Sequence, residues 1–323
     1  MGLLIGSRRA LLGGAGILPF FDDFDRANGA LGGKWIAPTW TIDTNQAKNT
    51  PTEGEEKVAN GTFAAWTTDN PDGWTVTGEV GADPEVSEVG TGEGHGGVGT
   101  GMCNLYQSAT VVQPRISQTP LTVDAWYVGR MDIDTRIAGT CRLIIGAIDV
   151  LYSSTGSKVQ TTRAKTTEVR VQGVQAGSDI TVDNVSMKPL TMADLFATLK
   201  TESADVTVQA AVTLATNTQA GIVVNVDNPT SPQSFVVGFH DGIYAYLVKY
   251  VSGTATELIK EVVAYGAGQL VKIVKDGTAY ALYYNGVQVS TTKTISDAEI
   301  VNNRYHGMFN TYSGNRIDDF DAL

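Results

Sequence analysis

The pattern of apolar and polar positions is clearest in the C-terminal part of the chain. Runs of β-branched and aromatic residues lie between short polar turns, at 234–240, 243–251, 257–264, 269–275, 278–284 and 287–291. Three of the turns are Asp-Gly or Asn-Gly pairs, at 241–242, 276–277 and 285–286. Such pairs supply the positive φ angles that tight hairpins require. The pattern therefore predicts an antiparallel meander.

Apolar runs in the middle of the chain are shorter and less regular. They predict strands at 121–130, 141–151, 168–173 and 179–187. Short strands separated by turns indicate sandwiches rather than alternating strands and helices. One segment, 192–199, has a helical pattern and is expected to form at most a short linker helix. The predicted class is all-β, with two antiparallel β-sandwiches of jelly-roll type, one inserted in the other.

Similar sequences at the two ends of the folded part suggest how the domains are organised. The segments 21–25 (FDDFD) and 317–321 (IDDFD) would lie side by side if the first and last strands pair. Residues 20–51 and 191–323 would then form one discontinuous sandwich, and residues 53–190 would be an inserted domain. Both edges of the insert are loop-like and contain proline. Insertion is tolerated where chain ends meet at a surface.

The N-terminal segment 1–19 differs from the rest of the chain in charge. It contains Arg8 and Arg9 and no acidic residue, and glycines interrupt its apolar stretches. A secretory signal would place its charges ahead of the apolar run, whereas residues 3–5 are apolar and precede them. We interpret the segment as an arm that docks on a partner. An uncleaved targeting segment is the alternative.

Composition and charge exclude several classes of partner. Hydrophobic residues make up 42% and charged residues 18%, and the 36 glycines favour strands and turns over helices. The net charge of −11 gives no electrostatic basis for binding nucleic acid or an anionic membrane surface. No apolar run approaches the roughly 18 residues of a membrane span. Cys103 and Cys141 could form one disulfide, but buried free thiols are the favoured interpretation.

Two groups of motifs carry family resemblances. The chain resembles concanavalin-A-like, laminin-G-like sandwiches at 20–29, 33–35, 40–42, 271–278, 283–287 and 317–320. It resembles family 4/9-type carbohydrate-binding-module jelly rolls at 60–63, 72–74 and 179–187. Many bacteriophage structural proteins pair modules of these kinds. The resemblance therefore implies a non-catalytic protein with two sandwiches that contacts glycans.

Motifs for catalysis are missing from the sequence. Sandwich glucanases that resemble the outer domain use a Glu-x-Asp-x-x-Glu strand, whose carboxylates act as nucleophile and acid/base. This chain has no such motif. His95, His240 and His306 have no nucleophile or base at a motif spacing. We therefore expect no enzymatic activity.

Calcium is the one cofactor that the resemblance implies. In both families the ion often ties the first strand to the last, and oxygen ligands suit it. Asp183 matches a ligating position of the module family, although Ala64 stands where a glutamate is common. If the end strands pair, four aspartates would cluster in the outer domain: Asp22, Asp23, Asp318 and Asp319. Arg26 and Arg316 could neutralise that cluster without a metal.

Sugar binding depends on flat aromatic rings and a few polar groups that fix orientation. The candidates in the insert are Trp66, Tyr106, Trp126 and Tyr127. The last two are adjacent in a strand, so we expect one in the core and the other exposed. In the outer domain Tyr244, Tyr246 and Tyr250 share one face of a strand, but Val248 interrupts the row.

These expectations combine into one functional hypothesis. The chain would be a bacteriophage virion structural protein, on the head or in a tail appendage, and extracellular when mature. Segment 1–19 would bind other virion proteins, and the sandwiches would contact host-surface polysaccharide. Formation of a homo-oligomer is left open. The alternative is a secreted or cell-surface bacterial protein that binds glycans.

Overall fold

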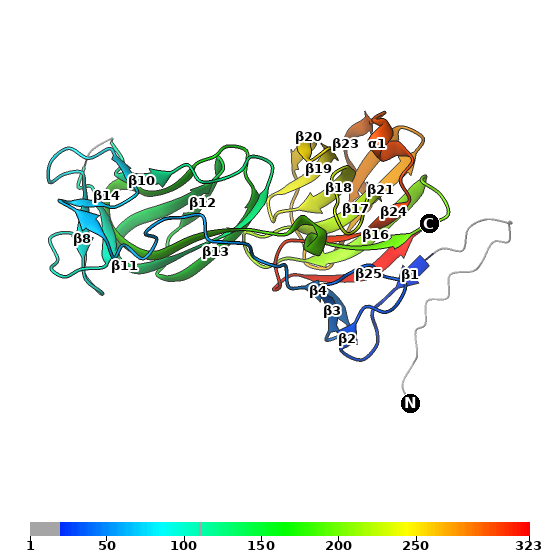
Figure 1. The fold of residues 1–323 in the computed structure, drawn as a ribbon, viewed down its shortest axis with the longest axis horizontal. Coiled ribbons are helices and arrows are strands. Elements are labelled where there is room, and N and C mark those ends of the chain that lie inside the picture. Colours follow the sequence, from blue (N-terminus) through cyan, green and yellow to red (C-terminus); the bar gives the residue numbers. More distant parts are fainter. Residues whose placement is uncertain (1–19, 110–111) are drawn as a thin grey trace.

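The computed structural model describes residues 20–109 and 112–323 of the 323-residue chain. Within these residues 56% lie in strands and 3% in helices, which confirms the predicted all-β class. Figure 1 shows two β bodies side by side along the long axis of the molecule. The predicted docking arm, with Arg8 and Arg9, lies outside the described residues.

The outer sandwich is built from two sheets. Sheet A contains β1 (Phe20–Asp22), β2 (Gly29–Ala30), β3 (Trp40–Asp43), β4 (Gln46–Asn49), β16 (Val206–Thr213), β21 (Gln269–Asp276), β22 (Ala279–Tyr284), β23 (Val287–Thr294) and β25 (Arg316–Ala322). Sheet B contains β15 (Phe196–Lys200), β17 (Ala220–Val226), β18 (Phe235–His240), β19 (Tyr244–Val251), β20 (Thr254–Val262) and β24 (Tyr305–Asn310). Their facing sides enclose a core that includes Ile222, Leu247 and Ile273.

The two ends of the folded part pair as expected. Strand β1 is antiparallel to β25, with Phe20 opposite Ala322 and Asp22 opposite Phe320. Sheet A therefore joins chain segments that lie on both sides of residues 53–190. The exact domain boundaries drawn from the sequence stay a prediction.

The predicted meander forms, but it is divided between the two sheets. Strands β18, β19 and β20 are neighbours in sheet B, whereas β21, β22 and β23 are neighbours in sheet A. Gly242, Gly277 and Gly286 have φ angles of 97°, 55° and 79°. Their lack of a side chain makes these left-handed turns accessible. The turn chemistry fixes each hairpin, while the segment between β20 and β21 crosses from one sheet to the other.

The insert has its own sheet, called sheet C, which differs from the expected set of short strands. It contains β7 (Thr75–Thr77), β8 (Glu85–Val89), β9 (Met102–Tyr106), β10 (Arg115–Gln118), β11 (Trp126–Ile145), β12 (Ile148–Tyr152), β13 (Gly156–Arg163) and β14 (Val169–Pro189). A separate small hairpin joins β5 (Trp66–Thr67) to β6 (Asn70–Pro71).

Two long strands replace several of the short ones that were predicted. Strands β11 and β14 pair along most of their lengths, with register shifts between Arg130 and Ala138 and again between Ala138 and Thr140. Such irregularities bend a strand. Each long strand can therefore contribute to both walls around the insert core, which includes Leu105, Ile145 and Val171.

Helical structure is brief in the described part of the chain. The expected helix at 192–199 is a single 3₁₀ turn, η1 (Met192–Leu195), followed directly by β15. Pairing with β24 decides the second half of that segment, because tertiary contacts override weak helical propensity. A second short helix, α1 (Ala298–Val301), was not predicted. No helix in the described residues is long and apolar enough to cross a membrane.

Both cysteines are free and fully buried, as the sequence analysis favoured. Burial raises the pKa of the Cys103 thiol far above its usual value and that of Cys141 to about 12. Both thiols are therefore neutral and act as small apolar side chains of the insert core.

Candidate functional site

Two of the four aromatic residues expected to bind sugar are buried. Trp126 and Tyr127 are 3% and 1% exposed. They are neighbours in β11, so their side chains point to opposite faces of the strand. Tyr127 packs in the insert core, and its hydroxyl accepts a hydrogen bond from the Thr122 amide at 2.9 Å. The expectation that one of the pair is exposed is wrong, because the outer sandwich covers the face that carries Trp126.

The other two aromatic candidates are half-buried and remain candidates. The Trp66 indole donates a hydrogen bond to the Phe63 carbonyl at 2.6 Å. The Tyr106 ring stacks on His95 with 3.5 Å between ring centroids. His95 Nδ1 lies 3.0 Å from Glu85 Oε2, which fixes the imidazole in place. One face of Tyr106 is therefore covered already, and only its other face could meet a sugar.

Asp22 in the outer sandwich is neutralised by an arginine. Arg26 donates hydrogen bonds to both of its oxygens, at 2.5 and 3.0 Å, and the Trp35 indole donates a third at 3.0 Å. Burial raises the pKa of Asp22, but these hydrogen bonds outweigh it and hold the pKa below its usual value. This geometry corresponds to the arginine alternative that the sequence left open.

The other three end-strand aspartates are not neutralised in the same way. Burial raises the pKa of Asp318, and the nearby carboxylates of Asp319 and Asp23 add to the effect. Arg316, which could have offset them, pairs instead with Asp43 at 3.1 Å.

Asp183, the metal candidate in the insert, is in a comparable situation. Burial raises its pKa, and the carboxylates of Asp132 and Asp134 raise it further. Within residues 20–109 and 112–323, no three Asp, Glu, His or Cys side chains gather in a way that would hold a metal ion. Calcium therefore stays a prediction of the resemblance, and no role of a metal is derived below.

The contact between the two sandwiches forms around an aromatic surface on sheet B. Phe235 stacks on Tyr250 across β18 and β19, with 4.4 Å between centroids, and Phe239 stacks on Tyr246 at 4.7 Å. Trp126 of the insert lies against Phe239 at 5.7 Å and donates its indole hydrogen to the Tyr250 hydroxyl at 3.0 Å. Burial of these large rings fixes the insert on the outer sandwich.

A buried polar cluster strengthens the same contact. The Thr161 hydroxyl of β13 donates to Gln219 Oε1 at 2.8 Å, and the Thr161 carbonyl accepts from Gln219 Nε2 at 2.7 Å. The Thr161 and Thr311 hydroxyls are also hydrogen-bonded, at 2.7 Å. At the edge, an ion pair of 2.8 Å joins Lys165 of the insert to Glu257 of β20. The two bodies are thus held by both apolar and polar contacts.

The contact opens at one end into a cleft with a volume of about 270 Å³, which we call the junction cleft. Strands β12 and β13 approach it from the insert, and β19 and β20 from sheet B. Its lining consists of Ala147, Ile148, Asp149, Val150, Gln160, Thr161, Asn217, Gln219, Asp241, Ile243, Tyr244, Tyr246 and Lys260. The lining combines rings, aliphatic groups and uncharged polar groups with three charged residues, Asp149, Asp241 and Lys260, and apolar walls with a few polar groups are typical of small-molecule sites.

Asp241 shapes the outer-sandwich wall of the cleft. Its Oδ1 accepts hydrogen bonds from the Ile243 and Tyr244 amides at 2.8 and 2.7 Å, and its Oδ2 accepts from the Tyr246 hydroxyl at 2.9 Å. This local turn sets the direction in which both tyrosines leave β19. Burial raises the pKa of Tyr246, so its hydroxyl stays protonated as the donor.

Tyr244 and Lys260 form the open rim of that wall. The Tyr244 ring is half-buried and meets the Tyr246 ring edge-on at 6.0 Å. The Lys260 ammonium lies 4.4 Å from the Tyr244 centroid and 5.8 Å from that of Tyr246. Lys260 itself is exposed, so the ammonium can leave the rings without disturbing the core.

The insert wall offers a hydrogen-bond acceptor that is not in use. Gln160 is 1% exposed, and its Oε1 has no hydrogen-bond partner among the described residues. Its Nε2 donates to the Ile148 carbonyl at 3.3 Å, which orients the amide. A buried acceptor without a partner is costly and is commonly satisfied by water or a ligand. Gln160 therefore brings an unpartnered acceptor to the lining that Tyr244 shares, and because this oxygen is itself buried, a ligand hydroxyl reaches it only when the amide turns toward the cleft.

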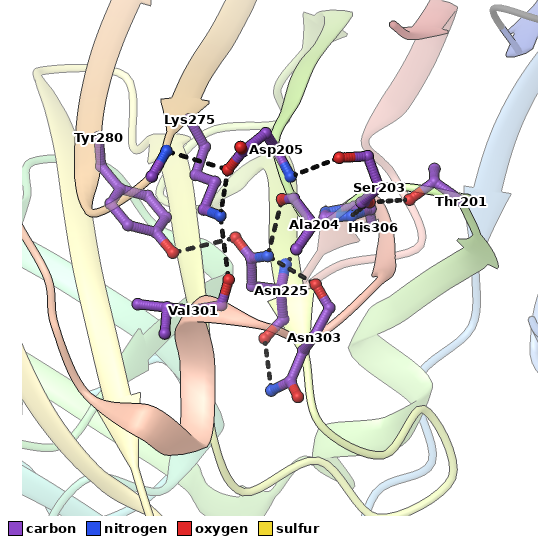
Figure 2. Close-up of polar contacts among 11 residues, drawn as sticks. Thr201, Ser203, Ala204, Asp205, Asn225, Lys275, Tyr280, Val301, Asn303 and His306 are labelled. Carbon is purple, nitrogen blue, oxygen red and sulfur yellow. Dashed lines mark hydrogen bonds and ion pairs between the residues drawn. The ribbon is translucent and has the colours of Figure 1, made fainter. Parts of the chain in front are cut away.

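A second group of polar residues resembles an active site by composition, and Figure 2 shows how they lie. We call it the Asn225 network: Thr201, Ser203, Ala204, Asp205, Asn225, Lys275, Tyr280, Val301, Asn303 and His306. Asn225 is fully buried and donates to the Ala204 and Asn303 carbonyls at 3.1 and 2.6 Å. The Tyr280 hydroxyl donates to its Oδ1 at 3.1 Å.

Lys275 and His306 of this network are buried, whereas the Asp205 side chain is 53% exposed. His306 Nδ1 accepts a hydrogen bond from the backbone amide of Asn225. Burial lowers the pKa of His306 to about 4, so the ring is neutral. Lys275 donates to Asp205 and to the Val301 carbonyl at 2.5 and 2.9 Å. The hydrogen bond from Lys275 holds the pKa of Asp205 below its usual value. The network therefore ties loops together, and its one carboxylate, that of Asp205, is occupied by Lys275 and the Gly277 amide.

Sequence reasoning found only part of the junction cleft. It identified the turn at 241–242 and placed Tyr244 and Tyr246 on one strand face, but it dismissed the row because of Val248. It missed Gln160 and Lys260 completely. Their neighbourhood arises only when the insert docks on sheet B, and a strand pattern contains no signal for such docking.

No family model and no curated protein sequence matches this chain. A solved carbohydrate-binding module from Bacillus subtilis is 13% identical, with a TM-score of 0.29, and the match covers 40% of this chain and 77% of the module. A xylan β-1,4-xylosidase from Bacillus halodurans is 14% identical with a TM-score of 0.30, covering 39% of this chain and 29% of the enzyme.

A third similar structure is a glycoside hydrolase family 43 protein from Bacillus licheniformis. It is 12% identical with a TM-score of 0.28, and the match covers 68% of this chain and 61% of that protein. Likenesses at these identities and TM-scores decide neither the fold nor the function.

Proposed function

We propose that this protein binds glycans in the junction cleft. The observation that carries the proposal is the combination, in one open cleft, of the half-buried Tyr244 ring with the unpartnered acceptor of Gln160. A pyranose has an apolar face that stacks on a ring and hydroxyls that donate to buried acceptors. The family resemblance of both sandwiches supports the same class of ligand.

Binding at such a site is expected to be weak for each copy of the chain. The cleft is small, and only one tyrosine ring is available for stacking. Several copies held on one particle or surface would strengthen attachment, because linked sites raise the effective concentration of the ligand.

We propose further that the protein attaches to host-surface polysaccharide as a bacteriophage virion component. Support comes from the resemblance and from the basic segment 1–19, which would dock on other virion proteins. The alternative is a secreted or cell-surface bacterial protein with the same cleft. Immunogold electron microscopy with antibody to residues 53–190 separates them: label at regular positions on particles supports the virion, and label on cells or in the medium overturns it.

We also propose that the chain is not an enzyme. The cleft contains two carboxylates, Asp149 and Asp241. Asp241 holds the turn of β19 with both oxygens, and Asp149 Oδ2 lies 3.3 Å from Arg142 Nε. A glycosidase needs one carboxylic acid that protonates the leaving group and a second carboxylate that is free to act as nucleophile or base. Asp149 and Asp241 are not arranged in this way. Mass spectrometry of a bound oligosaccharide after prolonged incubation should find it intact, and cleaved product would overturn this part.

The glycan proposal is tested by a glycan array followed by isothermal titration calorimetry of the hits. Tyr244→Ala should weaken binding about tenfold, because stacking on one ring is lost. Tyr283→Ala is the matched control, since Tyr283 also carries a lysine ammonium at 4.4 Å, from Lys272, but lies outside the cleft. Equal binding by both variants and the unmodified chain would place the site elsewhere. An array without hits would overturn the proposal.

A further inference from the structure

The charged side chains that line the junction cleft differ in whether they have a hydrogen-bond or ion-pair partner. Asp149 is paired with Arg142, and Asp241 accepts three hydrogen bonds from its own turn and the start of β19. The lining residue Lys260 makes no ion pair or hydrogen bond within the described residues and contacts only two tyrosine rings. It is also the only cationic side chain in the lining, for the part of the chain that the structure describes.

We infer that the junction cleft selects glycans that carry a carboxylate, such as uronic acid residues, through Lys260. The inference rests on the proposed function and names the class of glycan. A carboxylate can form a charge-assisted hydrogen bond with the ammonium, which is stronger than an exposed cation–π contact. When the ammonium leaves the tyrosine rings and binds a ligand carboxylate, the exchange therefore favours an acidic ligand.

The position of Lys260 makes this exchange selective. Its ammonium lies over the Tyr244 ring, which is the ring that a sugar would use for stacking. A carboxylate draws the ammonium away and leaves that ring accessible to the sugar. A neutral sugar must displace the ammonium without offering it a charged partner. The contact with Lys260 thus weakens the binding of neutral glycans and strengthens the binding of acidic ones.

The chain's net charge of −11 repels acidic polymers at long range. The selectivity must therefore come from contact at Lys260, and not from the overall field. Measurements at about 0.15 M ionic strength suit the test, because the Debye length is then about 8 Å and distant charges are screened.

The experiment compares oligouronates of several kinds with the neutral oligosaccharides obtained by reducing their carboxyl groups. Calorimetry on the whole chain should give about tenfold tighter binding for at least one acidic member than for its reduced form. Lys260→Met should abolish that preference and leave the affinity for the neutral form equal or higher. Lys260→Glu should reverse it. Lys272→Met is the matched control, because Lys272 has the same ring contact on sheet A.

The outcomes separate this inference from the proposed function. Equal affinity for acidic and reduced forms, or a preference that survives Lys260→Met, overturns the role of Lys260 while glycan binding stands. An array whose hits are all neutral glycans also overturns the role of Lys260 while glycan binding stands. Absence of any glycan binding by the unmodified chain overturns both. Circular dichroism of each variant verifies that the fold is intact, which is expected because Lys260 is exposed.

Discussion

The Asn225 network and the junction cleft contain similar kinds of side chain, yet they differ in where their hydrogen bonds go. In the network, the amide of Asn225 and the ammonium of Lys275 reach carbonyl and carboxylate groups of the loops around them (Figure 2). In the cleft, Gln160 Oε1 lacks a partner and Lys260 has only ring contacts among the residues that the structure describes. Unused hydrogen-bonding capacity beside an open volume indicates a binding site better than residue type does.

The same contrast explains why a catalytic role for His306 is unsupported. A histidine near a lysine, an aspartate and a tyrosine has the composition of an active site. Burial keeps the ring neutral down to acidic pH, and its two nitrogens face the Asn225 amide and the Ser203 carbonyl. The histidine stabilises loops on which other functions could be built, and substitutions there should affect folding rather than binding.

The largest loss of stability is expected at Trp126, which lies in the contact between the two sandwiches. Trp126→Ala removes a buried indole that fills the space between the two sandwiches, so the free energy of unfolding should fall by about 4 kcal/mol. Trp126→Phe keeps a ring but loses the hydrogen bond to Tyr250 and part of the buried indole volume, which should cost about 2 kcal/mol. Urea unfolding measures both. A small loss for Trp126→Ala would mean that the insert is only loosely attached to sheet B.

The next effect tests whether the Asn225 network serves the fold and not glycan binding. Asn225→Ala removes the donor to two part-buried carbonyls and the acceptor of the buried Tyr280 hydroxyl, and alanine is strained at a φ of 53°. We expect a loss of about 3 kcal/mol of unfolding free energy with glycan affinity unchanged. Exposed Asn302 is the control, and Asn302→Ala should cost no more than about 0.5 kcal/mol. Weaker glycan binding in Asn225→Ala would move the site toward the network.

The third prediction concerns pH and His306. Its pKa falls from the usual 6.5 to about 4 on folding, so the unfolded chain binds a proton first as pH decreases. The stability that depends on the neutral ring is complete above pH 6.5 and is lost between pH 6.5 and 4, by about 3 kcal/mol. Burial also lowers the pKa of His240, which acts in the same direction.

Urea midpoints at pH 7, 6 and 5 measure this dependence. The variant His306→Gln should be less stable at pH 7 and should lose a large part of the decline on acidification. An unchanged decline in the variant would show that other groups, such as His240, cause it.

The smallest effect on stability is expected inside the junction cleft. Gln160→Leu removes an acceptor without a partner among the described residues and one long hydrogen bond, of 3.3 Å, to the Ile148 carbonyl, so unfolding free energy should change by less than about 1 kcal/mol while glycan affinity falls about tenfold. Gln219→Leu is the matched control, because this glutamine is buried at the same junction and fully bonded to Thr161 and Thr311. It should cost about 2 kcal/mol. A comparable loss for both would show that Gln160 serves the fold.

The fold was more predictable than the site. The Asp-Gly and Asn-Gly pairs located the hairpins of the C-terminal part, because turn chemistry is local. The matching sequences at 21–25 and 317–321 correctly indicated that the chain ends pair. The insert was predicted poorly, since β11 and β14 are long bent strands whose bulges leave no clear alternation.

Trp126 shows why the site could not be predicted. A strand pattern assigns Trp126 and Tyr127 to opposite faces, but it cannot say that a second body covers the outer one. The tyrosines of β19 are a similar case: their common face was evident, and their partial burial by the insert was not. Residues 148–160 and 241–260 meet in the cleft although they are distant in the chain.

By itself the sequence determined the all-β class, the hairpins and the acidic surface charge, because these follow from local turn geometry, residue periodicity and composition. The tertiary structure decided which aromatic rings are buried, which carboxylates are neutralised and where an open cleft remains. The physical reason is that burial and hydrogen-bond satisfaction depend on how two sheets from different segments pack. Lys260, Tyr244 and Gln160 became a candidate site only through that packing.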